Sequence, residues 1–291
     1  MRTLIVKTGN IRLDKFLLNE YPSLTFNMLQ RFFKENKIKV NSKKIPLNSI
    51  LNDGDEIKIF ILDKYLGEET AILDKASIIY EDDNILVVNK PAGLITIDEN
   101  VNLDSLNNRI KSYLSTDNGS VCHRLDRGTS GLVIFAKNAN IENVLLDAIK
   151  HHKLRKFYRC VTFGWPKPNC GEIHNYLLKD DSGYVKAFNT QIENSKEAIT
   201  KYKTIATKDE LALIDLEILT GRTHQIRVHM KSLSCPILGD SKYGNESANR
   251  KYKKNRQCLC AYKIILPIFS GNFEYLSNME FSIPAPTFNL F

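Results

Sequence analysis

Strand patterns in the second part of the chain constrain the fold most strongly. Ile85–Val88 is a continuous apolar run, as expected of a strand covered on both faces of a sheet, and it breaks at the Pro/Gly turn Asn89–Gly93. Side chains alternate along Lys156–Gly164 as they do along a strand, and Leu211–Leu219 is another strand. Asn140–His152 has helical spacing. We therefore expect an α+β fold, with a large mixed, mainly antiparallel sheet and flanking helices.

The chain is expected to fold as two domains joined by a linker. With 291 residues, 43% of them hydrophobic, it is long enough to bury more than one core. The pattern changes near residue 65, which predicts a first domain over residues 1–62, a linker over 63–76 and a second domain over 77–291. The linker stretch holds charged and small residues without a sustained period.

The charge balance favours a polyanionic partner. The formal net charge is +8, and residues 1–60 hold 11 Lys and Arg against 6 Asp and Glu, so this fifth of the chain carries +5 of the excess. No secretory signal and no apolar run of membrane-spanning length is visible. The six cysteines include no C-x-x-C pair and are interpreted as reduced thiols. We expect a monomeric cytoplasmic protein without membrane contact.

One loop combines a carboxylate with basic residues and glycines immediately before an apolar strand. The sequence HRLDRGTSG, residues 123–131, runs directly into Leu132–Ala136. A reactive side chain is exposed in such a place, although an isolated Asp in a glycine-containing loop is more often a turn former. The nine residues resemble the HRLD-x-x-TSG catalytic motif of the RluA family of RNA pseudouridine synthases. The resemblance implies pseudouridine synthesis with Asp126 as the catalytic nucleophile.

Pseudouridine formation breaks the N1–C1′ bond of a uridine, turns the base and rejoins it to the ribose through C5. The ribose passes through positive character at C1′ or loses a proton from C2′. A carboxylate such as Asp126 attacks or stabilises this centre, much as one does in glycoside hydrolysis, and a nearby cation would keep it ionised. This chemistry requires no metal or redox cofactor, so we expect none.

Two residues of the same motif are expected to contact the substrate. A target uridine inside paired RNA must leave the base stack, and the planar guanidinium of Arg124 is able to occupy the vacated place. The resemblance implies this role, because the family uses the arginine of its HRLD motif in this way. The alternative for Arg124 is a phosphate contact or an ion pair with an acidic residue of the loop. His123 is a second candidate for substrate binding.

A strand carries the candidate base platform. Lys156–Val161 resembles the K-x-Y-x-A strand of the family, with Cys160 in place of the usual Ala. The resemblance implies that Tyr158 stacks on the target base and is a candidate proton acceptor. A buried tyrosine combines an apolar ring with a polar tip, which suits both roles.

A third motif supplies the expected cation. Residues 219–230, LTGRTHQIRVHM, match the family's TGRTHQIRVH, and Thr223 is predicted to cap the helix that follows. Arg227 would then lie in the first turn, close to the positive end of the helix dipole. By resemblance, Arg227 is the arginine that pairs with the catalytic Asp126, and Arg222 is a substrate or scaffold contact.

A metal site is not expected on this helix, because His224 and His229 are five residues apart, roughly 140° around a helix, and cannot face one ion together. Two shorter stretches also resemble the family. Residues 90–93 match its KPAG turn, which makes Lys90 a further substrate-binding candidate, and residues 236–244 match its P-x-x-GD-x-x-YG. A dense basic stretch follows over residues 250–256, which is either a solvated loop or a contact to the RNA backbone.

The first domain resembles an RNA-binding module. Helical spacing occurs over residues 13–17 and 28–33, and strands are predicted over Lys37–Val40 and Glu56–Phe60. This order, with RLDKFL at the front and GDEIKIF at the back, resembles an S4 domain, which precedes the catalytic domain in many RluA-family enzymes. Leu24–Asn27 stands where such modules carry a Ser-Arg pair. The candidates for RNA binding are Arg12, Arg31, Lys34, Lys39 and Lys43; the alternative is a charged solvated surface.

The resemblance covers nearly the whole chain and implies an enzyme that modifies structured RNA. Large-subunit ribosomal RNA is the first expected substrate and transfer RNA the second. A glycosidase-like hydrolase would need a second catalytic acid, and none accompanies these motifs. A non-catalytic RNA-binding or ribosome-assembly factor is the remaining alternative, but the set of Asp126, Tyr158 and Arg227 favours catalysis.

Overall fold

The computed structural model describes residues 2–22, 24–61, 73–97, 104–116 and 118–291. The chain divides into two compact units, one of residues 1–73 and 98–114 and the other of residues 74–97 and 115–291. Most of the predicted linker, residues 63–72, lies outside the described residues, so the predicted domain boundaries stay a prediction. No helix in the described ranges is long and apolar enough to cross a membrane.

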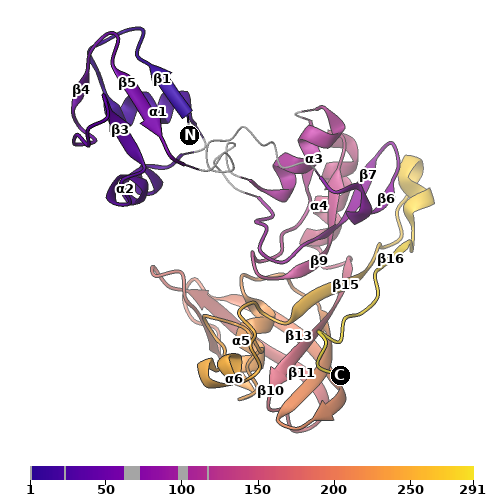
Figure 1. The fold of residues 1–291 in the computed structure, drawn as a ribbon. Coiled ribbons are helices and arrows are strands. Elements are labelled where there is room, and N and C mark those ends of the chain that lie inside the picture. Colours follow the sequence, from indigo (N-terminus) through magenta and orange to yellow (C-terminus); the bar gives the residue numbers. More distant parts are fainter. Residues whose placement is uncertain (1, 23, 62–72, 98–103, 117) are drawn as a thin grey trace. The chain divides into compact units, whose positions relative to one another are not determined.

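The first unit contains a small three-stranded antiparallel sheet and two helices of the front part of the chain (Figure 1). The elements are β1 (Arg2–Ile5), β2 (Ile11–Arg12), α1 (Leu13–Glu20), α2 (Phe26–Lys34), β3 (Ile38–Val40), β4 (Ile50–Leu51) and β5 (Glu56–Ile59), with α3 (Leu106–Leu114) assigned to the same unit. The two predicted helices and two predicted strands are confirmed, whereas β1 was not predicted. Leu17, Leu29 and Ile57 belong to the core and are fully buried.

The second unit is built on one large sheet in the order β12-β11-β13-β14-β10-β15-β9-β7-β6, with β16 beside β15 and β8 beside β9. Its elements are β6 (Ile78–Glu81), β7 (Ile85–Lys90), β8 (Ser120–Val121), β9 (Ser130–Ala136), α4 (Ala139–Lys150), β10 (Arg155–Phe163), β11 (Cys170–Lys179), β12 (Val185–Phe188), β13 (Lys196–Lys208), β14 (Leu211–Ile218), α5 (Gln225–Ser232), α6 (Glu246–Lys251), β15 (Leu259–Ile265) and β16 (Glu280–Ser282), with short 3₁₀ helices over Lys75–Ser77 and Gly271–Leu276. The pairing of β9 with β15 is parallel, and the other pairs described are antiparallel. The predicted mixed, mainly antiparallel sheet with flanking helices is confirmed.

Apolar cores hold helices against this sheet. The predicted run Ile85–Val88 is fully buried on both faces of β7. Ile141 and Leu145 of α4 pack into the same core as Ile134 of β9, so α4 covers this part of the sheet (Figure 1). At the other end, α5 contacts β12 and β13.

The centre of the sheet places the ends of three segments close together. Ala261 of β15 is in register with Tyr158 of β10 on one side and with Gly131 of β9 on the other. Gly131 has a φ of +117°, and a Cβ at this position would lie 2.2 Å from the Ala261 carbonyl oxygen, so only glycine fits. The glycine that ends the HRLDRGTSG motif therefore allows β9 to start against β15, directly after the loop that carries Asp126.

Candidate active site

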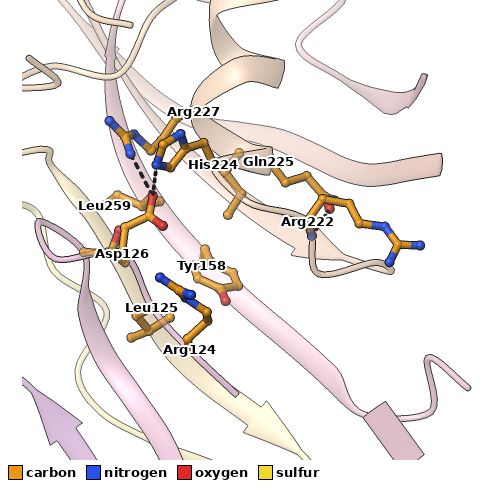
Figure 2. A pocket seen from close by; sticks show the side chains of 11 residues that line it. Arg124, Leu125, Asp126, Tyr158, Arg222, His224, Gln225, Arg227 and Leu259 are labelled. Atoms are coloured by element: carbon orange, nitrogen blue, oxygen red, sulfur yellow. Dashed lines mark hydrogen bonds and ion pairs between the residues drawn. The ribbon is translucent and has the colours of Figure 1, made fainter. Parts of the chain in front are cut away.

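The three motif segments meet in one cavity of the second unit. The Asp126 loop precedes β9, and Tyr158 lies on β10, with β15 between these two strands. Arg227 lies on α5, which follows β14, the neighbour of β10 on the opposite side. The side chains that line the cavity are Arg124, Leu125, Asp126, Thr129, Tyr158, Arg222, His224, Gln225, Ile226, Arg227 and Leu259 (Figure 2). The strand order β14-β10-β15-β9 thus explains why stretches far apart in sequence share a site.

Asp126 forms the expected ion pair with Arg227. Arg227 Nη1 donates to Asp126 Oδ2 at 2.9 Å, and His224 Nε2 lies 4.0 Å from the same oxygen. Figure 2 shows both groups on one side of the carboxylate. The Asp126 side chain keeps 24% of its surface exposed, so the carboxylate is held by a cation and still faces the cavity. This combination is what an attacking carboxylate needs.

A second carboxylate, Asp240, holds the remaining edge of the Arg227 guanidinium. Nε donates to Asp240 Oδ2 at 2.7 Å and Nη2 donates to Oδ1 at 2.9 Å, in bidentate geometry. Burial alone would raise the pKa of Asp240, but the hydrogen bonds and charge of Arg227, together with the backbone amides of Tyr243 and Lys242, outweigh this effect and lower the pKa. The sequence reasoning gave Asp240 no role. The quoted match to P-x-x-GD-x-x-YG contained the residue and was the one signal that could have found it.

The start of α5 differs from the prediction. Thr223 does not cap the helix, which begins at Gln225 after His224 in a left-handed conformation with a φ of +56°. The Gln225 side chain instead holds the turn before the helix, because its Oε1 accepts from the Arg222 amide at 3.0 Å and from the Thr220 hydroxyl at 2.8 Å. Arg227 still lies in the first turn, as predicted.

The left-handed turn directs His224 toward the site. Its Nδ1 lies 2.9 Å from the hydroxyl of Tyr243, which also accepts a hydrogen bond from the Val185 amide. Burial lowers the pKa of His224 below its usual value, although Asp126 opposes this effect. The network favours a neutral ring with its proton on Nε2, facing Asp126. His224 was predicted only not to bind a metal, and this position beside the carboxylate was missed.

Tyr158 lies beside Asp126 and lines the same cavity, with 6% of its surface exposed. Burial and the charge of Asp126 raise the pKa of its phenol. The side chain is therefore a neutral phenol at physiological pH. A protonated, mostly buried ring fits the platform role directly, whereas a role as proton acceptor requires the phenol to pass its own proton on.

Three further residues predicted to contact the substrate, Arg124, His123 and Arg222, line this cavity or the one beside it. Arg124 is exposed, lines the cavity and has no hydrogen-bond or ion-pair partner among the described residues, so the alternative of an ion pair with a loop acid is not observed. His123 accepts a hydrogen bond at Nε2 from the Ile134 amide at 3.3 Å and lines an adjoining cavity. Arg222 donates from Nε to the Glu197 carbonyl at 2.8 Å, and its guanidinium points away from Asp126 in Figure 2.

The prediction that Lys90 contacts the substrate is corrected. Its side chain is completely buried, and Nζ donates to the carbonyl oxygens of Leu94 at 2.7 Å and Pro91 at 3.1 Å. The amide of Gly93 in the same turn donates to the Arg127 carbonyl at 2.6 Å. Lys90 therefore closes the KPAG turn, and the turn in turn supports the loop that carries Asp126.

The five RNA-binding candidates of the first unit lie on its helices, strands and loops without forming a described cavity. Arg12 pairs with the Asp14 carboxylate at 2.6 Å, and Arg31 lies 4.7 Å from the centre of the Phe32 ring. Lys34 and Lys43 are exposed, and Lys39 is partly buried. Their function stays a prediction.

The basic stretch 250–256 contacts the protein itself at several points. Arg250 pairs with Glu246 at 3.0 Å, Lys251 pairs with Glu210, and Lys254 Nζ donates to the Phe288 carbonyl at 2.9 Å. These pairs are largely exposed, so they leave both interpretations of the stretch open.

Comparisons with known proteins identify the family of the chain. The chain matches the family model described as RNA pseudouridylate synthase over residues 84–232. It is 40% identical over 254 residues to ribosomal large subunit pseudouridine synthase C of Rickettsia felis, a match that covers 81% of this chain and 82% of that protein. It is 32% identical over 293 residues to ribosomal large subunit pseudouridine synthase D of Borreliella burgdorferi, covering 94% and 87%. A solved structure, human RNA pseudouridylate synthase domain containing 1, is similar with a TM-score of 0.60 and 25% identity, over 72% of this chain and 83% of that chain.

Proposed function

This chain belongs to the RNA pseudouridylate synthase family, and on that premise we propose that it converts specific uridines of large-subunit ribosomal RNA to pseudouridine. The enzyme class follows from the family. The choice of RNA is supported by the relatives from Rickettsia felis and Borreliella burgdorferi, both named for the large ribosomal subunit. The observation that carries the chemical part is the Asp126 carboxylate, held by Arg227 and open to a cavity that Tyr158 lines.

In this proposal Asp126 attacks C1′ of the flipped uridine or stabilises positive charge there while the N1–C1′ bond breaks. The freed base turns and C5 bonds to C1′, which breaks any bond that Asp126 has formed to C1′. The proton leaves C5 and N1 gains a proton, so the atoms of the nucleotide are conserved. Arg227 holds the carboxylate in place and compensates its charge. Asp126 is the only carboxylate lining this cavity among the described residues, which disfavours a glycosidase that uses two.

Arg124 and Tyr158 are assigned to the base. Extrusion of a paired base costs a few kcal/mol, and a planar guanidinium that replaces it in the stack offsets part of that cost. The unpartnered, exposed guanidinium of Arg124 at the cavity is free to do so, as far as the described residues extend. Tyr158 then packs against the extruded uracil inside the cavity.

The first unit is proposed to be an S4-type module that adds affinity for RNA. Its order of two helices followed by strands β3 and β5, and its excess of basic residues, support this proposal. The match to the Borreliella burgdorferi protein covers 94% of the chain, so it extends beyond the region that the family model matches.

The proposed function is tested by mapping pseudouridine across all cellular RNA in cells with and without the gene. We expect one or a few uridines of large-subunit ribosomal RNA to lose modification in the deletion strain and to regain it when the gene is restored. Loss confined to transfer RNA would contradict the proposed substrate, and an unchanged map would contradict the proposed activity.

A further inference from the structure

A buried lysine without a partner lines a second cavity that adjoins the active site. Lys156 has 9% of its surface exposed, and among the described residues its ammonium has no hydrogen bond or ion pair. Burial, together with the charge of Arg222, lowers the pKa of Lys156 to about 8. Removing most of a lysine from water without giving its ammonium a partner costs free energy, and such residues occur preferentially at functional sites.

The cavity that Lys156 lines is basic. It has a volume of about 390 Å³ and shares Arg124, Asp126, Tyr158 and Arg222 with the catalytic cavity. Its lining holds four lysines and arginines against one carboxylate, and that carboxylate, Asp126, is already paired with Arg227. The side chains concerned are Arg124, Lys150, Lys156 and Arg222, with His123 and His152 beside them. The chemistry of this lining suits an anion.

Space is left beside the ammonium. A Cβ at Gly221 would lie 3.3 Å from Lys156 Nζ, closer than such contacts normally are, and Gly221 lines the same cavity. The absence of a side chain at this position therefore leaves one side of the ammonium open. A glycine here is not required by the backbone, because its φ lies outside the left-handed range.

Lys156 stands at a fixed distance from the base platform. Lys156 and Tyr158 are two residues apart on β10, so their side chains emerge from the same face of the sheet about 6.6 Å apart. Asp126, Lys156 and Tyr158 line the same cavity. A nucleotide whose base packs on Tyr158 and whose C1′ meets Asp126 would therefore have its backbone beside the space that Lys156 lines.

From these observations we propose that Lys156 and the basic cavity around it bind the phosphodiester group next to the target uridine. This inference rests on the proposed function and deepens it. Lys156 is a substrate-binding residue in this account, which fixes the flipped nucleotide through its backbone rather than through its base. A phosphate supplies the countercharge that the folded protein lacks, so the binding is charge-assisted.

The test uses the uridine identified by pseudouridine mapping, in a stem-loop RNA with one neutral methylphosphonate linkage either 5′ or 3′ of it. At one of these two positions the neutral linkage should weaken binding to the wild-type protein about tenfold. Lys156→Met should weaken binding of the normal RNA by a similar factor, and the neutral linkage should then have no further effect. A neutral linkage several nucleotides away is the matched RNA control.

Two further variants separate binding from folding. Lys153→Met changes an exposed lysine outside this cavity and should bind as the wild type does. Gly221→Ala places a methyl group against the ammonium and should weaken binding of the normal RNA without removing any charge. Lys156→Met should melt at or above the wild-type temperature, whereas a purely structural lysine would lower it on removal.

The outcomes are distinct. If Lys156→Met and the neutral linkage weaken binding independently, so that their factors multiply, the phosphate site is wrong while the proposed function stands. The phosphate site is also wrong if the wild-type protein binds the normal RNA and both RNAs with a neutral linkage equally well. A wild-type protein that forms no pseudouridine in any RNA overturns the proposed function and this inference with it.

Discussion

Arg227 is shared between two carboxylates: Asp240 holds its Nε and Nη2 at 2.7 and 2.9 Å, and Nη1 alone extends 2.9 Å to Asp126. The Asp240 side chain is completely buried, and its Oδ1 also accepts from the backbone amides of Lys242 and Tyr243. Asp240 therefore fixes the orientation of the guanidinium, and the guanidinium fixes the carboxylate that reacts. Asp240 is a positioning residue for Asp126.

Asp240→Asn should lower turnover more than it lowers RNA affinity. The substitution keeps the shape but removes the charge that orients Arg227, and breaking a buried ion pair on one side destabilises by about 3–5 kcal/mol at most. We expect kcat to fall at least about tenfold with KM within about twofold, because Arg227 can then turn away from Asp126. Single-turnover kinetics of pseudouridine formation measure this. If kcat of Asp240→Asn fell only by as much as the folded fraction of the protein, Asp240 would have a structural role and no positioning role.

Replacing the two buried lysines of the second unit by Met should change the stability of the protein in opposite directions, with a loss for Lys90→Met and a gain for Lys156→Met. Burial lowers the pKa of both Lys90 and Lys156 to about 8, but Lys90 donates to carbonyl groups and Lys156 does not. Lys90→Met should destabilise the protein by about 1–3 kcal/mol, since the buried Leu94 carbonyl and the partly buried Pro91 carbonyl lose their donor. It should also lower activity through the loop that carries Asp126. Urea unfolding of the two variants side by side tests this contrast.

The stability of Lys156→Met should depend on pH in a defined direction. Between pH 8 and 10.5 the unfolded chain binds more protons at Lys156 than the folded protein does, so wild-type stability rises with pH over this window. The variant lacks this group and should exceed the wild type by on the order of 2 kcal/mol at pH 7, with the difference shrinking toward pH 10.5. Lys90 is present in both proteins, and its effect cancels. A variant less stable than the wild type at pH 7 would contradict the burial argument.

Tyr158→Phe should distinguish the contribution of the ring to RNA binding from that of the hydroxyl to turnover. The ring supports the base in either protein, so RNA affinity should stay within about twofold. Loss of the hydroxyl should slow turnover by about 10²-fold, the usual contribution of a positioned proton-transfer group. Because burial and Asp126 raise the phenol pKa, wild-type kcat should show no tyrosine titration below pH 10. An unchanged rate in the variant would leave Tyr158 as a platform only.

Much of the fold and of the site could be predicted because their signals are local. The uninterrupted apolar run Ile85–Val88 and the alternation after Lys156 each report on one strand, and both strands are present. The ion pair between Asp126 and Arg227 followed from motif resemblance rather than from spacing, since 101 residues separate the partners.

The missed features depend on tertiary structure. Whether Lys90 faces solvent is decided by the turn that folds over it, and a lysine after a strand gives no sign of that cover. The turn before α5 is held by the Gln225 side chain, which also donates to the Ile199 carbonyl on β13, and a capping pattern in the sequence does not indicate such a contact. Likewise, the pairing of Asp240 with Arg227 depends on how α5 packs against the loop that carries Asp240.

Three basic residues of the first unit, the exposed Lys34 and Lys43 and the partly buried Lys39, should set part of the salt dependence of RNA binding. A triple variant in which Lys34, Lys39 and Lys43 are each replaced by Gln should have a flatter slope of log affinity against log salt concentration. The slope should change by about 2, as expected when three phosphate contacts are lost. Conversion of a short model RNA at saturating concentration should change little, since the site lies in the other unit. An unchanged salt slope would remove the RNA-binding role from these lysines.

Asp126 is proposed to be the group that acts on the ribose, and every other role proposed for the site depends on it. Purified wild-type protein and Asp126→Asn should be compared for pseudouridine formation in a large-subunit ribosomal RNA transcript, with RNA binding measured in parallel. The Asn side chain preserves size and can still contact Arg227 but is a poor nucleophile, so the rate should fall by at least about 10³-fold while affinity stays within a few-fold. Pseudouridine formation by Asp126→Asn at the wild-type rate would contradict the account.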